Sequence, residues 1–354
     1  MSDQPQRPVV AAVPPAPVDE VDDAEVERGH RVLTEGVGVL DRSAAGKLSL
    51  TGTEAAGFLT GQVTADIEAI APGHGSYAAL LTPKGKIVCD LRVLNLDGEL
   101  FLLCERVGLQ SLFDQLRRHL IGFDAELHKQ TLQRSLLSLI GPGAGALLGD
   151  AAAGLGPAEH DHVAAEIGGR PVRLVRTAEG VDLLAAAEDG AAVLSALREA
   201  GAVPVPEAAA EIVRVRAGRP RLGQEMDDGV MPAEVGIVDR AVSFTKGCYV
   251  GQETVARLHW RGRPNRHLRG LRLERSVPPG TVLVADGREI GRVTTSVRSP
   301  VDGPIALALV RREIEPGDRV TLRPADGSPT SARVVALPFD APRAAPSHPV
   351  PPVG

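Results

Sequence analysis

The chain has 354 residues, of which 43% are hydrophobic and 24% are charged, as in an ordinary globular protein with more than one packed domain. Its net charge of -6 gives no general attraction to nucleic acid, so any such binding requires a local basic patch. Three widely spaced cysteines, Cys89, Cys104 and Cys248, argue against a disulfide framework and against a zinc finger.

The hydropathy and the two ends of the chain predict a cytoplasmic protein that does not enter a membrane. No apolar run reaches the roughly 18 residues that a membrane-spanning helix needs. The N-terminus lacks the basic and apolar segments of a signal peptide. Residues 1–25 and 341–354 are rich in Pro and Ala, which predicts a disordered leader and a disordered tail.

Residues 26–264 alternate strand patterns with helix patterns. Short β-type runs come first, followed by a helix that we expect Thr53 to cap. Residues 77–105 read as three strands joined by turns. The next segment is an amphipathic helix whose apolar stripe consists of Leu109, Leu112, Phe113, Leu116 and Leu120. Strands followed by a helix recur further along, which predicts an α+β fold.

Residues 265–340 have a different pattern. Short strands at regular spacing are separated by Pro and Gly turns, which is typical of a small β-barrel or sandwich. The predicted organisation is therefore an α+β region over residues 26–264 and a β-domain over residues 265–340.

The stretch FTKGCYVGQE, residues 244–253, is the first candidate for chemistry. Lys246 could lower the pKa of the Cys248 thiol, and His259 could act as a base if it folded back. The alternative is that Cys248 is a packing residue, because free cysteine is among the most buried residue types. The pattern alone favours packing.

Asp90 is the second candidate, because it lies in the apolar stretch GKIVCDLRV. A carboxylate in such a strand either faces solvent or belongs to a site that perturbs its pKa. The alternating pattern alone favours the solvent face. The acidic residues between 223 and 234 lack the spacing of a calcium loop, so no metal site is predicted.

Residues 257–275 contain seven arginines and Trp260, the one tryptophan of the chain. This arginine-rich run could bind phosphates, an RNA backbone or a polyglutamate tail. The alternative is a solvated linker between domains.

The stretch KGCYVGQETVAR, residues 246–257, closely resembles the signature of the YgfZ proteins, the folate-binding relatives of the glycine-cleavage T-protein, an aminomethyltransferase. FLTGQVTADI, YAALLTPKGKIVCDL, RAGRPRLGQEMDDGVMPAE and GRVTTSVRSP are similar to further stretches of that family, in the same order. The resemblance covers about residues 30–340. It implies three α+β subdomains in a cloverleaf ring, followed by a C-terminal β-barrel.

The resemblance also implies that tetrahydrofolate binds in the channel through the ring. By motif position, the residues implied to contact it are Tyr77, Asp90, Asp182, Tyr249 and Gln252. Carboxylates suit a pterin ring, whose amino and ring N–H groups need acceptors. We further infer that the arginine-rich run meets the glutamate tail of the folate.

YgfZ proteins are associated with the assembly or repair of iron–sulfur clusters, including those of tRNA-thiolating enzymes. The resemblance therefore implies a folate-binding accessory protein with a reactive Cys248 beside Lys246, whose partners are iron–sulfur client enzymes or assembly proteins. The first alternative is a folate-dependent aminomethyl or one-carbon transferase with Asp90 as its acid/base group. The second is an RNA-binding module that uses the arginine-rich run.

Two departures from the aminomethyltransferases count against the transferase alternative. Cys89 stands where the transferases carry the first of two aspartates, and Arg216 stands where related sequences often show an acid. The first change removes a carboxylate and the second inverts a charge.

Overall fold

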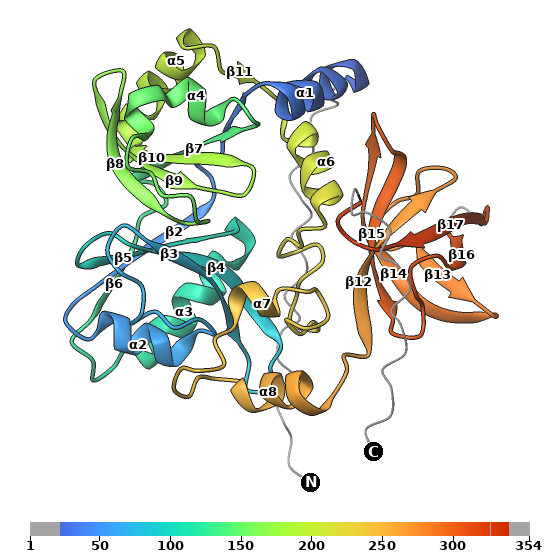
Figure 1. The fold of residues 1–354 in the computed structure, drawn as a ribbon. Coiled ribbons are helices and arrows are strands. Elements are labelled where there is room, and N and C mark those ends of the chain that lie inside the picture. The colour runs from blue at the N-terminus through green and yellow to red at the C-terminus, as the bar shows by residue number, and fades with distance from the viewer. Residues whose placement is uncertain (1–21, 326, 340–354) are drawn as a thin grey trace, which may run out of the picture.

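The computed structural model describes residues 22–325 and 327–339, and Figure 1 labels its helices and strands. Two sheet-based lobes, a mainly helical segment and a closed barrel make up the described chain. This architecture confirms the predicted α+β region followed by a β-barrel. Among the described residues, no helix is long and apolar enough to cross a membrane.

The first lobe is built on an antiparallel sheet of five strands in the order β3-β4-β5-β2-β6. Its elements are β2 (Gly46–Thr51), α2 (Ala55–Gln62), β3 (Gly75–Leu81), β4 (Ile87–Asn95), β5 (Glu99–Cys104), η1 (Arg106–Gly108), α3 (Leu109–His119) and β6 (Glu126–Lys129). The predicted apolar stripe on α3 is confirmed, since Leu109, Leu112 and Leu116 are buried, and Phe113 and Leu120 are partly buried against the same core. The predicted Thr53 cap is wrong: the N-cap of α2 is Glu54, and the Thr53 hydroxyl donates to Asp124 instead.

The second lobe is built on a sheet of six strands in the order β11-β1-β7-β10-β9-β8. Its elements are β1 (Gly38–Asp41), β7 (Arg134–Ile140), α4 (Ala144–Leu148), η2 (Gly149–Ala152), β8 (His162–Ile167), β9 (Arg170–Arg176), β10 (Gly180–Ala186), η3 (Ala187–Asp189), α5 (Gly190–Glu199) and β11 (Val203–Pro204). Because β1 belongs to this sheet and β2 to the other, residues 42–45 cross from one lobe to the other.

Residues 207–264 form the third part of the ring and contain α6 (Glu207–Ala217), α7 (Val238–Ala241) and α8 (Gln252–Arg261). Helix α6 packs against α1 (Asp23–Glu35) at the top of Figure 1. It ends at Gly218, whose φ of 69° places it in the left-handed region that favours glycine.

The barrel closes in the order β12-β15-β14-β13-β16-β17. Its strands are β12 (Arg266–Leu273), β13 (Val282–Ala285), β14 (Arg288–Ser299), β15 (Gly303–Arg311), β16 (Arg319–Arg323) and β17 (Thr330–Val335). The barrel does not stand apart from the ring. Leu268, Leu309 and Phe339 belong to the same buried apolar cluster as Phe58 and Leu80 of the first lobe.

The N-terminal boundary differs from the prediction. Residues 23–25, expected in a disordered leader, form the first turn of α1, because the Asp22 carboxylate accepts the backbone N–H of Ala24 and caps the helix. Residues 1–21 of the predicted leader and the predicted tail, residues 341–354, lie outside the described residues.

Candidate functional site

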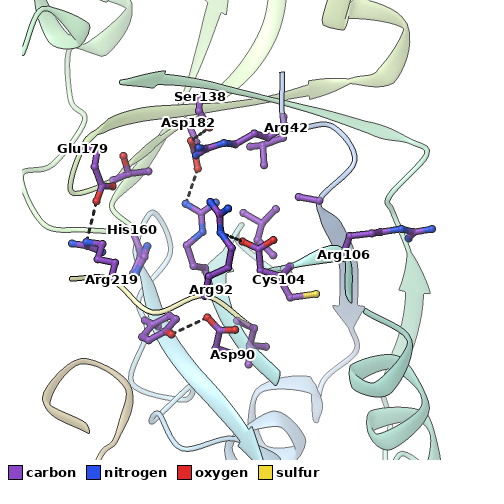
Figure 2. A pocket seen from close by; sticks show the side chains of 18 of the residues that line it. Arg42, Asp90, Arg92, Cys104, Arg106, Ser138, His160, Glu179, Asp182 and Arg219 are labelled. Carbon is purple, nitrogen blue, oxygen red and sulfur yellow. Dashed lines mark hydrogen bonds and ion pairs between the residues drawn. The ribbon is translucent and has the colours of Figure 1, made fainter. Parts of the chain in front are cut away.

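A cavity of about 690 Å³ lies where the two lobes meet the third part of the ring (Figure 2). Its volume is in the range of small-molecule sites. The lining side chains come from both sheets and from the loops around them, and most of them are polar. They include Asp41, Arg42, Tyr77, Asp90, Arg92, Glu105, Arg106, Ser138, Glu159, His160, Glu179, Asp182, Glu207, Arg219, Arg221 and Arg240.

The alternation of β4 decides which of its side chains reach the cavity. Successive residues of a strand point to opposite faces of the sheet. Asp90 and Arg92 line the cavity, whereas Cys89 is fully buried in the apolar core of the first lobe. The neighbouring positions 89 and 90 therefore belong to different environments.

Asp90 is held by Tyr77 on the neighbouring strand β3. The Tyr77 hydroxyl donates to Oδ2 of Asp90 over 2.8 Å. Oδ1 is also buried, and none of the described residues donates a hydrogen bond to it. Burial raises the pKa of Asp90 to about 6, although the hydrogen bond from Tyr77 opposes the shift. The solvent-facing interpretation of Asp90 was therefore wrong.

Asp182 reaches the same cavity from the second lobe, but both of its oxygens are engaged. Ser138 donates to Oδ1 over 2.6 Å, and the Arg92 guanidinium pairs with Oδ2 over 2.7 Å (Figure 2). The pair formed by Arg92 and Asp182 joins the two sheets across the cavity. Asp182 can accept further hydrogen bonds only through its remaining lone pairs.

His160 is a cavity residue that the sequence did not reveal. Its backbone φ is 74°, in the left-handed region that non-glycine residues rarely adopt. Its Nδ1 is buried and has no hydrogen-bond partner within the described chain. Burial and the nearby Arg92 lower the pKa of His160 to about 4, so the ring is neutral at pH 7. No motif marks this position in the sequence.

Three more charged residues, from two loops and from helix α7, were also missed. The Glu159 carboxylate pairs with Arg219 and with Arg240, each at 3.0 Å. Arg240 also lies over the ring of Tyr77, 4.9 Å from its centroid. Through these contacts, Arg240 of the third part of the ring packs against the Tyr77 side of the Tyr77–Asp90 pair. Their partners are about 60 and 80 residues apart, so no local pattern could have joined them.

The residues of the KGCYVGQE stretch do not line this cavity. Cys248 is exposed, so its interpretation as a packing residue was wrong. Tyr249 is buried, its hydroxyl has no hydrogen-bond partner among the described residues, and burial raises its pKa to about 12. Gln252 is the first residue of α8. The predicted site is thus divided between the cavity and a second place on the surface.

Gly251 fixes the KGCYVGQE stretch against the first lobe. Its φ of 86° is in the left-handed region, and a Cβ there would lie 2.6 Å from the carbonyl oxygen of Thr82. The packing is equally close on the side of the β3–β4 hairpin, where a Cβ on Gly85 would lie 3.0 Å from Thr254 of α8. Glycine is therefore required at both positions by close packing and backbone conformation.

Lys246 has a structural role in this arrangement. Its ammonium donates to the backbone carbonyls of Thr60, Val63 and Ala65, at the end of α2, and lies 4.8 Å from the centroid of the Tyr249 ring. Burial lowers the pKa of Lys246 to about 8. These three carbonyls occupy the donors of Lys246, so no contact within the described chain supports its predicted action on Cys248.

Replacing Lys246 by Met should lower the free energy of unfolding by about 1–3 kcal/mol, because buried carbonyls lose their donor. Urea denaturation followed by circular dichroism measures the change. Lys84→Met is the matched control, since Lys84 is exposed on the β3–β4 turn and should shift stability by less than about 0.5 kcal/mol. Equal midpoints for the two variants would contradict the structural role.

The arginine-rich run is not a continuous basic surface. Arg266, Arg269 and Arg272 lie on β12 and form ion pairs with Glu234, Glu315 and Asp302 respectively. None of the seven arginines lines the cavity. The cavity lining gives no support to the inference that this run meets a folate glutamate tail, and that inference stays a prediction.

Both departures from the transferase pattern lie away from the cavity. Cys89 faces the core, and its thiol donates to the carbonyl oxygen of Asp90 over 3.1 Å. Arg216 pairs with Asp302 of the barrel at 2.7 Å. Neither change alters the charge of the cavity wall, so neither argues against chemistry there.

Comparison with known proteins agrees with this geometry. Residues 10–246 match the GCVT N-terminal domain, and residues 266–340 match the glycine cleavage T-protein C-terminal barrel domain. The chain belongs to the GCVT family. Its relatives include the aminomethyltransferase of Streptomyces coelicolor, 31% identical over 332 residues that cover 88% of each chain.

A second GCVT relative is a putative chloroplastic transferase of Arabidopsis thaliana, At1g60990, 28% identical over 267 residues. That alignment covers 73% of this chain and 62% of the relative, so the chain spans less than two thirds of it. Among solved structures, the glycine cleavage system aminomethyltransferase T from Bartonella henselae superimposes with a TM-score of 0.80 over 89% of each chain, at 23% identity. This likeness shows a shared GCVT fold.

Proposed function

We propose that the chain binds tetrahydrofolate in the cavity and serves as an accessory factor in the assembly or repair of iron–sulfur clusters, including those of tRNA-modifying enzymes. The cavity holds the folate, and the exposed thiol of Cys248 acts at a separate place. The observation that carries the folate half is the unpartnered, buried Oδ1 of Asp90.

The residues present fit tetrahydrofolate. The amino and ring N–H groups of a pterin are donors, and Oδ1 of Asp90 is an acceptor without a partner among the described residues. His160 supplies a second unpartnered polar atom in the same cavity. A buried polar group without a partner is costly, so two of them facing one cavity favour a polar ligand there.

Three residues of the cavity would have separate roles in binding tetrahydrofolate. Asp90 would accept N–H groups, and Tyr77 would hold its carboxylate in place through the hydroxyl bond at 2.8 Å. Arg240 would keep the Tyr77 ring in position, 4.9 Å away. When bound, tetrahydrofolate supplies nitrogen atoms that can carry a one-carbon unit.

The accessory role is supported by the place of Cys248. The thiol is exposed on a stretch that closely resembles the YgfZ signature, and Gly251 and Lys246 anchor that stretch to the first lobe. An exposed thiol can reach a partner protein, which a buried thiol cannot. Cys89 and Cys104 are both buried, so Cys248 is the exposed cysteine of this chain.

One observation favours aminomethyl or one-carbon transfer as a second candidate. Asp90 keeps its carboxylate in the cavity with a pKa of about 6, near the working pH of a general acid or base. The replaced aspartate position, Cys89, faces the core and would not have contributed to the cavity. The relatives named aminomethyltransferase make this reaction the natural alternative.

The test combines binding with rescue. Calorimetry should show that the wild type and Cys248→Ser bind tetrahydrofolate equally, since Cys248 does not line the cavity. In cells that lack the protein, the wild type should restore the activity of iron–sulfur enzymes, and Cys248→Ser should not. Rescue by Cys248→Ser would overturn the accessory role of the thiol.

The transferase candidate is tested separately with purified protein. Incubation with tetrahydrofolate and an aminomethyl-loaded lipoyl protein should give no methylenetetrahydrofolate if the accessory function is correct. Steady turnover that is lost in Asp90→Asn would establish the transferase instead.

A further inference from the structure

One surface of the molecule remains unexplained by the folate cavity. The α8 face consists of Phe244, His259 and Trp260 with the arginines of α8 and its C-terminal loop. Figure 1 shows α8 at the bottom of the molecule, below α7. Trp260 is 70% exposed, an unusual state for the one tryptophan of the chain.

The aromatic side chains of the α8 face form one ordered cluster. The rings of Phe244 and His259 stack with centroids 4.0 Å apart. Trp260 meets both edge-on, at 6.0 Å from Phe244 and 4.6 Å from His259. The exposed indole is therefore held in a defined position by its neighbours, which reduces the entropy that it would lose on binding a partner.

A hollow of about 300 Å³ adjoins this cluster. Val255, Leu258 and His259 of α8 form one wall, and Pro264 and His267 lie at another. Because His259 belongs both to the hollow and to the aromatic cluster, an apolar side chain placed in the hollow would lie beside Trp260.

The charge beside Trp260 has one dominant sign, although Asp239 lines the hollow itself. Helix α8 and its C-terminal loop, residues 252–264, carry three arginines and one acidic side chain, in a protein of net charge -6. Arg257 pairs with that acid, Glu253, at 2.6 Å. Arg261 and Arg263 are exposed, and no ion pair joins either of them to another described residue. The free charge at the rim beside Trp260 is therefore positive, and the carboxylate of Asp239 lies inside the hollow.

We propose that the α8 face docks an acidic protein segment that carries an apolar side chain. The apolar side chain would enter the hollow beside Trp260, and carboxylates on either side would pair with Arg261 and Arg263. An apolar centre with an aromatic anchor and a charged rim is typical of protein–protein interfaces. One exposed tryptophan is too few for a base-stacking surface, which favours protein over RNA.

This inference rests on the proposed accessory function, because it names the partner surface that would serve Cys248. The thiol precedes α8 by four residues, and Trp260 is the ninth residue of that helix. Eight residues of helix advance about 12 Å, so a segment bound at Trp260 would hold its parent protein close to the thiol.

Trp260 allows a direct test, since all of the tryptophan fluorescence of the chain comes from this residue. The probe is a synthetic peptide with one leucine–phenylalanine pair flanked by three glutamates on each side. Titration into the full-length protein should change the Trp260 emission with saturation. Replacing the apolar pair by serines, or the glutamates by lysines, should remove the change.

Matched variants separate site binding from general charge. Arg261→Gln with Arg263→Gln should weaken the peptide about fivefold to tenfold at low salt, as expected for two exposed ion pairs. Arg288→Gln with Arg319→Gln removes the same charge from exposed positions of the barrel and should leave the affinity unchanged.

Three results would overturn the proposal: no emission change with the acidic peptide, equal binding of the serine peptide, or tighter binding of a single-stranded RNA oligonucleotide of equal charge. None of these results would change the outcome of the tetrahydrofolate titration or of the Cys248→Ser rescue experiment. The docking surface and the proposed function can therefore fail independently.

Discussion

Asp90→Asn should weaken tetrahydrofolate binding by about 100-fold and, at the same time, stabilise the folded protein at pH 7. Binding is weakened because the amide N–H of asparagine would face an N–H group of the pterin. The wild-type carboxylate would instead accept a hydrogen bond from that group. The stability gain follows because a buried ionised carboxylate is removed. Its pKa of about 6, against an ordinary value of 3.8, corresponds to about 1–3 kcal/mol at neutral pH.

The pH dependence of stability independently tests whether Asp90→Asn stabilises the folded protein. The folded protein holds the Asp90 proton more tightly than the unfolded chain, so wild-type stability from this group falls as pH rises from 3.8 to about 6. The advantage of Asp90→Asn should therefore be complete above pH 6 and absent below pH 3.8. Thermal unfolding at pH 7.5 and pH 4, with calorimetric folate titration at pH 7.5, measures both effects.

Two control variants define what the Asp90 result means. Asp97→Asn changes an exposed aspartate at the far end of the same hairpin and should alter neither binding nor stability. Tyr77→Phe removes the donor to Oδ2 and should raise the pKa of Asp90 further. As the pH is lowered, this variant should therefore lose folate binding at a higher pH than the wild type. Unchanged folate affinity in Asp90→Asn would remove Asp90 from the site.

Arg214→Met should strongly destabilise the folded protein, although methionine keeps much of the length of the arginine side chain. The Arg214 guanidinium bonds Glu225 at 2.8 Å and Glu211 at 2.6 Å, and the Glu225 side chain is completely buried. Removing the arginine leaves a buried charge without its partner, which costs about 3–5 kcal/mol. Thermal unfolding should show a fall of roughly 10 °C in Tm.

Arg292→Met provides the comparison for Arg214. Arg292 pairs with Glu289 at 2.8 Å, but both side chains are more than half exposed. An exposed pair of this kind contributes less than about 1 kcal/mol, so Tm should hardly move. Similar losses for the two variants would mean that the buried Glu225 carboxylate does not depend on Arg214 for its stability.

The strands and the barrel could be predicted because their information is local. The hairpin from β3 to β5 and the stripe on α3 follow from alternation, turn residues and helical spacing within 15 residues or so. The cap of α2 could not be predicted, because Thr53 is drawn to Asp124 by tertiary contact. Tertiary partners outcompeted the local rule at that position.

The candidate site was predictable only in part. The alternation on β4 identifies the face that Asp90 shares with Arg92, but it does not tell a cavity from bulk solvent. The wall is completed by Glu159 and His160 of one loop and by Arg240 of α7, about 80 residues further along, and none of them belongs to a motif. The arginine-rich run misled for a related reason, since half of it is a strand whose charges are paired across the barrel.

The shared apolar cluster has a consequence for how this chain can be divided. Leu268 and Leu309 of the barrel are buried with Phe58 and Leu80 of the first lobe, so neither part covers its own apolar face. A cut near Pro264 would leave two fragments that expose this face to water and are prone to aggregate. We therefore expect the two regions that match separate domain families to fold and unfold as one cooperative unit.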